Sequence, residues 1–357
     1  MKIIHVISNL ELAGAQTMCC NLLCALKSFE DNLTVVSLFD TDNSITNKLK
    51  DNGITVICLG KKMGLDVSMI RKLRKIFKKE KPDVIHAHAA TLKYVWPASI
   101  FKKAKIVHTI HTLADKEGSR SDTIVNRICY KTKKAFPAAL TPEVQKSISA
   151  KYNISCDKIP VIYNGIDLTS CIPKEKYVPN ETFKILHIGR FSEEKNHTGL
   201  INAFEIFHKE NSNTELYLIG DGQLKPTIEG MVKEKNLINS VHFLGIQTNV
   251  YPFLNDADLF VLPSTYEGMP MTLIEAMGTG LPIVATNVGG IPDMLADGSD
   301  AILVEANIKK IANAFIALAS DEKLRNKYGK NALERSKAFS SYKMAEDYYN
   351  FYKLVIK

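Results

Sequence analysis

The strongest constraint on the fold is a regular alternation of short apolar runs and amphipathic segments along the 357 residues. Runs rich in Ile, Val and Leu are typical of buried parallel strands, whereas apolar residues recurring every three or four positions indicate helices. The strands expected in the first half are Ile3–Ser8, Thr34–Leu38, Thr55–Leu59, Val84–His88, Ile106–His111 and Ala138–Thr141. Repeated β-α units of this kind predict a parallel sheet with helices on both faces.

The second half starts the same pattern afresh. Its expected strands are Lys184–Ile188, Glu215–Ile219, Val241–Phe243, Leu259–Leu262, Ile283–Thr286 and Ala301–Val304. We therefore predict an α/β protein of two Rossmann-like, doubly wound domains, residues 1–168 and 183–339, that face a central cleft. Residues 169–182 have no clear period and are expected to form the linker. The aromatic-rich segment 340–357 is expected to be a helix that packs back on the first domain.

Composition places the chain among ordinary globular proteins, with 45% hydrophobic and 24% charged residues. No stretch approaches the roughly 18 uncharged apolar residues of a membrane span. The seven cysteines form no Cys-x-x-Cys pair, which argues against a zinc knuckle or a thioredoxin-like site. We expect a reducing, cytoplasmic location.

The positive charge of the chain lies in its first half. Residues 1–170 carry an excess of 11 positive charges, whereas the remainder has a net charge of −3. Part of the excess is concentrated in residues 71–81, where apolar residues recur at helical spacing. An amphipathic helix with a solvated basic face is one interpretation, and a face that meets anionic lipid headgroups at the inner side of the cell membrane is the other. Nucleic acid is not an expected partner, because no binding motif accompanies the charge.

The most informative motif is the segment 263–277, Pro-Ser-Thr-Tyr-Glu-Gly-Met-Pro-Met-Thr-Leu-Ile-Glu-Ala-Met, which follows an expected strand. Glu267 falls in the strand-to-helix loop, and Glu275 lies about one turn into the helix, where a carboxylate can accept hydrogen bonds from ribose hydroxyls. The backbone N–H groups at the helix N-terminus offer a site for a diphosphate. These come from Gly268, Met269, Met271 and Thr272, with Pro270 suited to the first turn. A loop glutamate and a first-turn glutamate favoured by the helix dipole are the alternative interpretation.

On these residues the chain resembles the retaining GT-B glycosyltransferases of family 4. Their Glu-x7-Glu signature is matched by Glu267 and Glu275. Further matches, in chain order, are residues 12–16, Tyr163-Asn164-Gly165-Ile166-Asp167, Ile188-Gly189-Arg190 with Lys195-Asn196, Gly220-Asp221-Gly222, Phe243-Leu244-Gly245 and Gly289-Gly290-Ile291-Pro292. No single short motif is specific, but their order and spacing together are.

The resemblance implies roles for particular residues. It implies that Glu267 contacts the donor sugar, that Glu275 binds the ribose, and that the backbone near Gly245 lies by the base. Arg190 and Lys195 match the basic phosphate site, and their charges suit a departing diphosphate.

In the first domain, the resemblance implies that Gly14 opens a helix near the donor phosphates. Ala13 departs from the glycine pair usual in the family, which puts a close backbone approach at position 13 in doubt. His111 resembles a histidine that contacts the reacting sugar, where a neutral imidazole can hydrogen-bond a hydroxyl. A strand-end histidine bonded to backbone is the alternative.

We expect neither a metal nor another cofactor. His86 and His88 alternate on one strand face, but no third ligand is evident near them in the sequence. Asp40-Thr41-Asp42 and Asp256-Ala257-Asp258 lie away from the other motifs. Two basic side chains and a helix N-terminus can stabilise a leaving diphosphate without a divalent ion.

The function expected from these motifs is a metal-independent, retaining transfer of a sugar from a nucleotide-sugar, by family tendency a UDP-sugar, to an acceptor hydroxyl. The acceptor suggested by the charge and the resemblance is a glycan or lipid-linked glycan in cell-surface polysaccharide synthesis. A nucleotide-sugar epimerase or phosphorylase on the same fold, and a non-catalytic nucleotide-binding module, are the alternatives.

Overall fold

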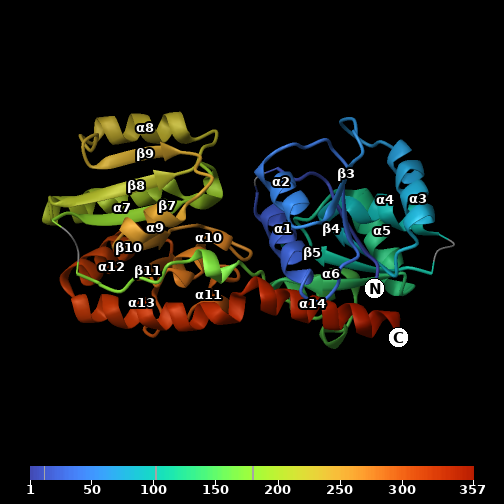
Figure 1. Cartoon of the computed structure of the whole chain (residues 1–357). Coiled ribbons are helices and arrows are strands. Elements are labelled where there is room, and N and C mark those ends of the chain that lie inside the picture. Colours follow the sequence, from blue (N-terminus) through green and yellow to red (C-terminus); the bar gives the residue numbers. More distant parts are fainter. Residues whose placement is uncertain (12, 101–102, 179–180) are drawn as a thin grey trace. The chain divides into compact units, whose positions relative to one another are not determined.

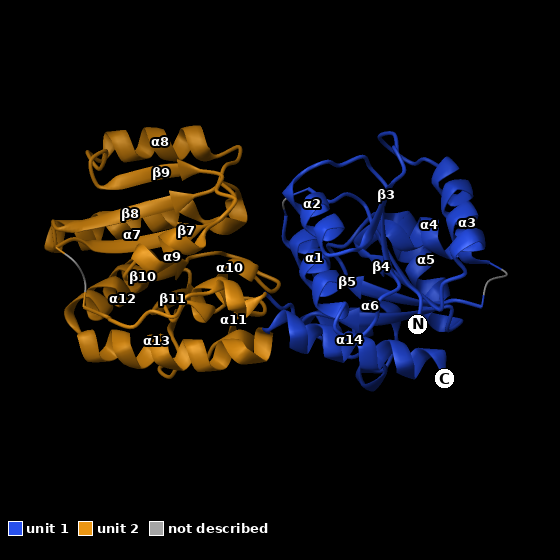
Figure 2. Cartoon of the chain, in the orientation of Figure 1, with its two compact units in different colours: residues 1–166, 340–357 blue, residues 167–339 orange. Residues whose placement is uncertain are grey.

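The computed structural model describes residues 1–11, 13–100, 103–178 and 181–357 (Figure 1). They form two compact units, coloured separately in Figure 2. Unit 1 consists of residues 1–166 and 340–357, and unit 2 consists of residues 167–339.

Unit 1 contains a six-stranded parallel sheet in the order β3-β2-β1-β4-β5-β6. Its strands are β1 Ile3–Ile7, β2 Leu33–Ser37, β3 Thr55–Cys58, β4 Val84–His88, β5 Lys105–Ile110 and β6 Ala135–Ala139. The helices of the unit are α1 Gly14–Leu26, α2 Ser44–Asp51, α3 Ser68–Glu80, α4 Leu92–Ser99, α5 Arg120–Lys131, α6 Pro142–Tyr152 and α14 Ser341–Ile356. The core forms because apolar residues of the strands and of α3 to α6 are buried together.

Unit 2 repeats this topology, with the sheet order β12-β11-β10-β7-β8-β9. Its strands are β7 Phe183–Ile188, β8 Thr214–Ile219, β9 Val241–Gly245, β10 Leu259–Leu262, β11 Ile283–Thr286 and β12 Ile302–Val304. Its helices are α7 His197–Glu210, α8 Lys225–Glu234, α9 Tyr251–Asp256, α10 Met271–Gly278, α11 Ile291–Met294, α12 Ile308–Ser320 and α13 Glu322–Ser336. The sheet positions confirm the prediction of two doubly wound Rossmann-like folds, with the predicted strands correct to within a few residues at each end.

The C-terminal helix α14 packs on α1 within unit 1. Ser340 caps its N-terminus by accepting a hydrogen bond from the backbone N–H of Lys343. Tyr348 and Tyr352, one helical turn apart, are fully buried, and the ring of Phe29 packs on two further tyrosines of the helix. This aromatic face explains why the last helix belongs to unit 1 although unit 2 precedes it in the chain.

The expected linker is tied to unit 2 over its described part. The backbone N–H of Lys174 donates to Thr279 O at 2.9 Å, and the Tyr177 hydroxyl donates to Gly280 O at 3.0 Å. Residues 167–178 therefore form part of unit 2 and do not act as a free connection. Residues 179 and 180 of the expected linker lie outside the described residues.

Candidate active site

The two loops that carry the sequence motifs of unit 2 follow β7 and β10, which are neighbouring strands at the point where the strand order reverses. Open α/β sheets bind ligands at this switch point. Lys195 ends a short 3₁₀ turn after β7, and its Nζ donates to Glu267 Oε1 at 2.5 Å. The Ser264 hydroxyl donates to the same oxygen at 2.6 Å. A buried carboxylate is thus held by a cation and a hydroxyl at the carboxyl end of the sheet.

The backbone around Glu267 is fixed by the loop that follows β11. Gly289 has φ +54°, and a Cβ at this position would lie 1.8 Å from Glu267 O, so only glycine fits. The N–H of Gly290 donates to the same carbonyl at 3.3 Å. On the other side, the N–H of Thr265 donates to Glu194 O at 2.8 Å, which joins the two motif-bearing loops.

Helix α10 begins directly after the Glu267 loop. Pro270 has extended backbone angles and precedes the helix, so it lies one position earlier than the first turn expected from the sequence. Met269, Pro270 and Met271 are buried, whereas Gly268 and Thr272 are partly exposed. No side chain caps this terminus. The uncapped N–H groups suit an anionic ligand.

Glu275 lies on α10 and is partly buried. Burial raises the pKa of its carboxyl group to about 7, because removal from water disfavours the charged form. A ligand that donated hydrogen bonds to this carboxylate would replace the lost hydration, as a pair of ribose hydroxyls would.

The backbone turns after β7, β8 and β9 lie close together. A Cβ on Gly220, which has φ +138°, would lie 2.0 Å from Gly189 O. The N–H of Gly220 donates to Gly245 O at 2.8 Å. The structure thus brings Gly245 beside the turn that precedes Arg190, whose side chain is exposed.

Unit 1 holds the remaining candidates, Gly14 and His111. Gly14 is exposed and begins α1, whose N-terminus has no side-chain cap. Position 12 of the same motif lies outside the described residues. His111 directly follows β5, and its backbone N–H donates to Glu117 Oε2 at 2.8 Å. Burial lowers the pKa of the His111 ring to about 3, so the imidazole is neutral.

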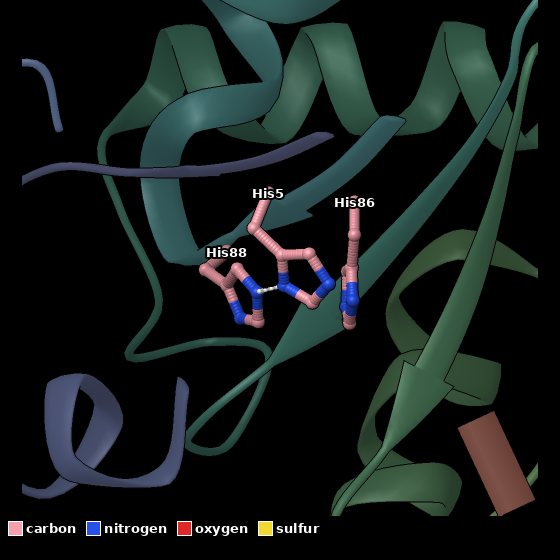
Figure 3. A group of neighbouring side chains, drawn as sticks. All are labelled: His5, His86 and His88. Carbon is pink, nitrogen blue, oxygen red and sulfur yellow. Dashed lines mark hydrogen bonds between the residues drawn. The ribbon is translucent and has the colours of Figure 1, made fainter. Parts of the chain in front are cut away.

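A third histidine, His5, lies beside His86 and His88, although it is 81 positions from His86 in the sequence (Figure 3). His5 on β1 pairs in register with His86 on β4, and the ligating atoms of the three rings lie within 4.8 Å of one another. The expectation that no third ligand lies nearby was therefore wrong. A clue was present, because the first and fourth strands of a doubly wound sheet with this strand order are neighbours.

The acidic triplet of unit 2 has structural partners. Asp258 accepts a hydrogen bond from the Lys184 backbone N–H at 2.9 Å, and Asp256 pairs with the Lys184 ammonium at 2.8 Å. Both lie at the end of the sheet opposite Glu267, because they precede β10.

Comparison with known proteins agrees with this arrangement. A crystal structure of the Anabaena protein HepE in complex with UDP-glucose matches 99% of this chain and 100% of its own, with a TM-score of 0.85 and 19% identity. This similarity defines the fold as GT-B, the two-domain Rossmann-like architecture of one class of glycosyltransferases.

Two family models together span most of the sequence. Residues 12–170 match Glycosyltransferase Family 4, and residues 172–335 match Glycosyl transferases group 1. The first half of the chain therefore belongs to Glycosyltransferase Family 4 and the second half to Glycosyl transferases group 1, and the protein is a glycosyltransferase.

Two bacterial relatives illustrate the activities found among similar chains. The UDP-Gal:alpha-D-GlcNAc-diphosphoundecaprenol alpha-1,3-galactosyltransferase of Escherichia coli is 27% identical over 93% of this chain and 91% of its own. The N-acetyl-alpha-D-glucosaminyl L-malate synthase of Bacillus anthracis is 29% identical over 82% of this chain and 80% of its own. None of the helices in the described residues is long and apolar enough to cross a membrane.

Proposed function

We propose that this glycosyltransferase transfers the sugar of a UDP-sugar to an acceptor hydroxyl, with retention of the anomeric configuration and without a metal ion. The observation that carries the proposal is the contact between Lys195 and Glu267 beside the uncapped N-terminus of α10. The choice of UDP is supported by the HepE structure, which holds UDP-glucose, and by the name of the Escherichia coli relative.

In this proposal unit 2 binds the nucleotide. The N–H groups at the start of α10 and the side chains of Arg190 and Lys195 stabilise the negative charge that develops on the departing diphosphate. These fixed positive groups supply the role that a divalent ion has in other transferases. Glu275 binds the ribose, and the backbone at Gly245 contacts the base.

Glu267 positions the donor sugar in this mechanism. It accepts two hydrogen bonds through Oε1 from Lys195 and Ser264, which leaves Oε2 for the sugar hydroxyls. His111, a neutral imidazole in unit 1, contacts the donor sugar. The departing phosphate takes the proton of the acceptor hydroxyl as the acceptor attacks from the face that the phosphate leaves.

Product analysis tests the reaction class. Incubation with a UDP-sugar in the presence of a chelator should release UDP and yield an α-linked product from an α-linked donor, as seen by NMR of the anomeric proton. A β-linked product, or turnover only with added Mg²⁺ or Mn²⁺, would contradict the proposal. Accumulation of a free epimer of the donor without acceptor would indicate an epimerase.

The acceptor in our proposal is a lipid-linked glycan presented at an anionic membrane surface. Helix α3 has its basic side chains exposed and Leu73 and Phe77 buried. The loop before it exposes three large apolar side chains, with Met63 at 90%, Leu65 at 72% and Val67 at 67%. Cationic groups beside exposed apolar side chains match an anionic lipid interface. The acceptor in the name of the Escherichia coli relative is likewise carried on a lipid diphosphate.

Vesicle flotation tests the membrane proposal. The protein should bind vesicles that contain phosphatidylglycerol at low salt, and binding should weaken in Met63→Ser/Leu65→Ser and in Arg71→Glu/Lys75→Glu. Matched controls are Ile246→Ser, which replaces an apolar side chain exposed to 67% in unit 2, and Lys309→Glu/Lys310→Glu. Equal loss in the controls, or no binding by the unmodified protein, would contradict the membrane proposal and favour an acceptor that is not held at a membrane.

A further inference from the structure

A chain of hydrogen bonds runs through the interior of unit 1 from His111 to the C-terminal helix α14. From the outer end inward, the contacts are His111 Nε2 to His88 Nδ1 at 3.3 Å, His88 Nε2 to His5 Nδ1 at 3.0 Å, His5 Nε2 to the Tyr352 hydroxyl at 3.5 Å, the Tyr352 hydroxyl to His86 Nδ1 at 2.7 Å, His86 Nε2 to Thr109 Oγ1 at 2.7 Å, and Thr109 Oγ1 to the Tyr348 hydroxyl at 2.7 Å. Figure 3 shows the three inner histidines of this chain.

The rings in the chain are neutral. Burial lowers the pKa of His5 and His111 to about 3 and holds the pKa values of His86 and His88 well below the usual range. A neutral imidazole has one N–H donor and one acceptor nitrogen, and a hydroxyl has a single proton to donate. A ring that accepts on one side therefore donates on the other. A hydroxyl that accepted on both sides would leave its own proton without a partner, so the bonds are best satisfied when all of them point the same way.

The inner end selects the direction. In the inward direction, each donor lies on the His111 side of its acceptor. Thr109 would then donate to Tyr348, and the hydroxyl proton of Tyr348 would lack an acceptor among the described residues. If the bonds point outward, Tyr348 donates to Thr109 and keeps only an unused acceptor. A buried donor without a partner is rarer than an under-used acceptor, so the outward direction is favoured.

We propose that Tyr352 is a positioning residue that holds His111 as the Nδ1–H tautomer, so that this ring offers a hydrogen-bond donor. In the outward direction Tyr352 donates to His5, His5 donates to His88, and His88 donates to Nε2 of His111. The proton of His111 is then on Nδ1. The functional value of this donor rests on the proposed contact between His111 and the donor sugar, where an N–H would bind a hydroxyl oxygen.

The same histidines also have the composition of a metal site. Cys19 Sγ lies 3.7 Å from His88 Nε2 and would complete a set of three imidazoles and one sulfur, which zinc accepts. However, each ring nitrogen of His5, His86 and His88 already has a hydrogen-bond partner. A nitrogen that bound a metal ion could no longer take part in this series of hydrogen bonds. Burial also raises the pKa of the Cys19 thiol, so the sulfur stays protonated.

The tautomer can be read directly from ¹⁵N–¹H correlation spectra of the imidazole rings in the full-length protein. We expect His111 to show a protonated Nδ1 and an unprotonated Nε2. In Tyr352→Phe, which keeps the ring but removes the donor to His5, both tautomers of His111 should become populated. Tyr152→Phe is the matched control, because Tyr152 is a buried tyrosine of the same unit whose hydroxyl instead accepts from Asn126.

Three results would overturn the proposal: an Nε2–H tautomer in the unmodified protein, an unchanged tautomer in Tyr352→Phe, or about one zinc ion per chain in the protein as purified. The activity readout is separate. If His111 binds the sugar as proposed, kcat should fall about tenfold in Tyr352→Phe and stay unchanged in Tyr152→Phe. A shifted tautomer with unchanged kcat would leave the positioning role intact and remove the proposed role of His111.

Discussion

Lys195 Nζ lies 2.5 Å from Glu267 Oε1, although the two residues are 72 positions apart in the sequence. Both side chains are largely buried, with 18% and 8% of their surfaces exposed. The pair joins the loops after β7 and β10, at the switch point of the unit 2 sheet. It places one positive and one negative group side by side, which suits a ligand that has both a diphosphate and a hydroxyl-bearing sugar.

Removing the charge of Glu267 should affect catalysis more than folding. Glu267→Gln keeps an oxygen that can accept from Lys195 and Ser264, so the free energy of unfolding should change by less than about 1.5 kcal/mol. The contact with the donor sugar weakens, and kcat/KM should fall by about 100-fold or more. Steady-state kinetics and urea unfolding check both parts, and near-full turnover would remove the proposed role of Glu267.

The fit of Gly289 against Glu267 gives a second prediction. Gly289→Ala introduces a Cβ 1.8 Å from Glu267 O, so the loop has to move, and the free energy of unfolding should fall by more than about 3 kcal/mol. Gly298→Ala is the matched control, because Gly298 also has positive φ (+69°) but no atom within 4 Å of the added carbon. It should cost only the backbone strain, about 1–2 kcal/mol. Similar losses in urea unfolding of the two variants would contradict the packing argument.

Nucleotide binding should depend on the ionisation of Glu275. The pKa of its carboxyl group is raised to about 7 in the unliganded protein, and ribose hydroxyls would bind the charged form. Affinity for UDP should therefore rise from about pH 6 to about pH 8, with release of a proton on binding. Calorimetry in buffers with different ionisation heats measures that release. Glu275→Gln should lose it, and equal proton release in the variant would assign the effect to the nucleotide.

Buried neutral histidines should make unit 1 unstable in acid. Their folded pKa values lie below the unfolded value of about 6.5, so the unfolded chain takes up protons that the folded unit cannot. These residues are His5, His86, His88, His108 and His111. Each contributes stability that is present above about pH 6.5 and is lost, by about 1.4 kcal/mol per pH unit, as the pH falls toward its folded value.

Glu117 acts in the opposite sense, but it is a single group. Burial raises its pKa in the folded state to about 7, so the folded protein binds this proton at a higher pH than the unfolded chain does. As the pH falls, the stability gained in this way offsets the loss from about one of the five histidines. The fluorescence of Trp96, the one tryptophan of the chain, reports on unit 1 in urea unfolding. A midpoint that did not decrease between about pH 7 and about pH 5 would contradict the neutral assignment of these rings.

The alternation of apolar runs and amphipathic segments was enough to predict the strands of both sheets. A buried parallel strand is a continuous apolar run, which can be recognised without knowing which strands lie beside it. Val84–His88 and Leu259–Leu262, for example, have the predicted bounds. The site residues of unit 2 were predicted from motif order, and the structure places Lys195 against Glu267. The apolar pattern by itself could not place His5 beside His86, since that contact depends on strand order, which only the predicted doubly wound fold class supplies. It also could not place Tyr352, 266 positions from His86, since helix packing fixes it.

Calorimetric titration of the purified protein with UDP, GDP, ADP and NAD, each with and without a chelator, tests the central claim most directly. We expect binding of UDP that resists the chelator and is lost in Glu275→Ala. Absence of nucleoside diphosphate binding, or binding only with a divalent ion present, would contradict the proposed site.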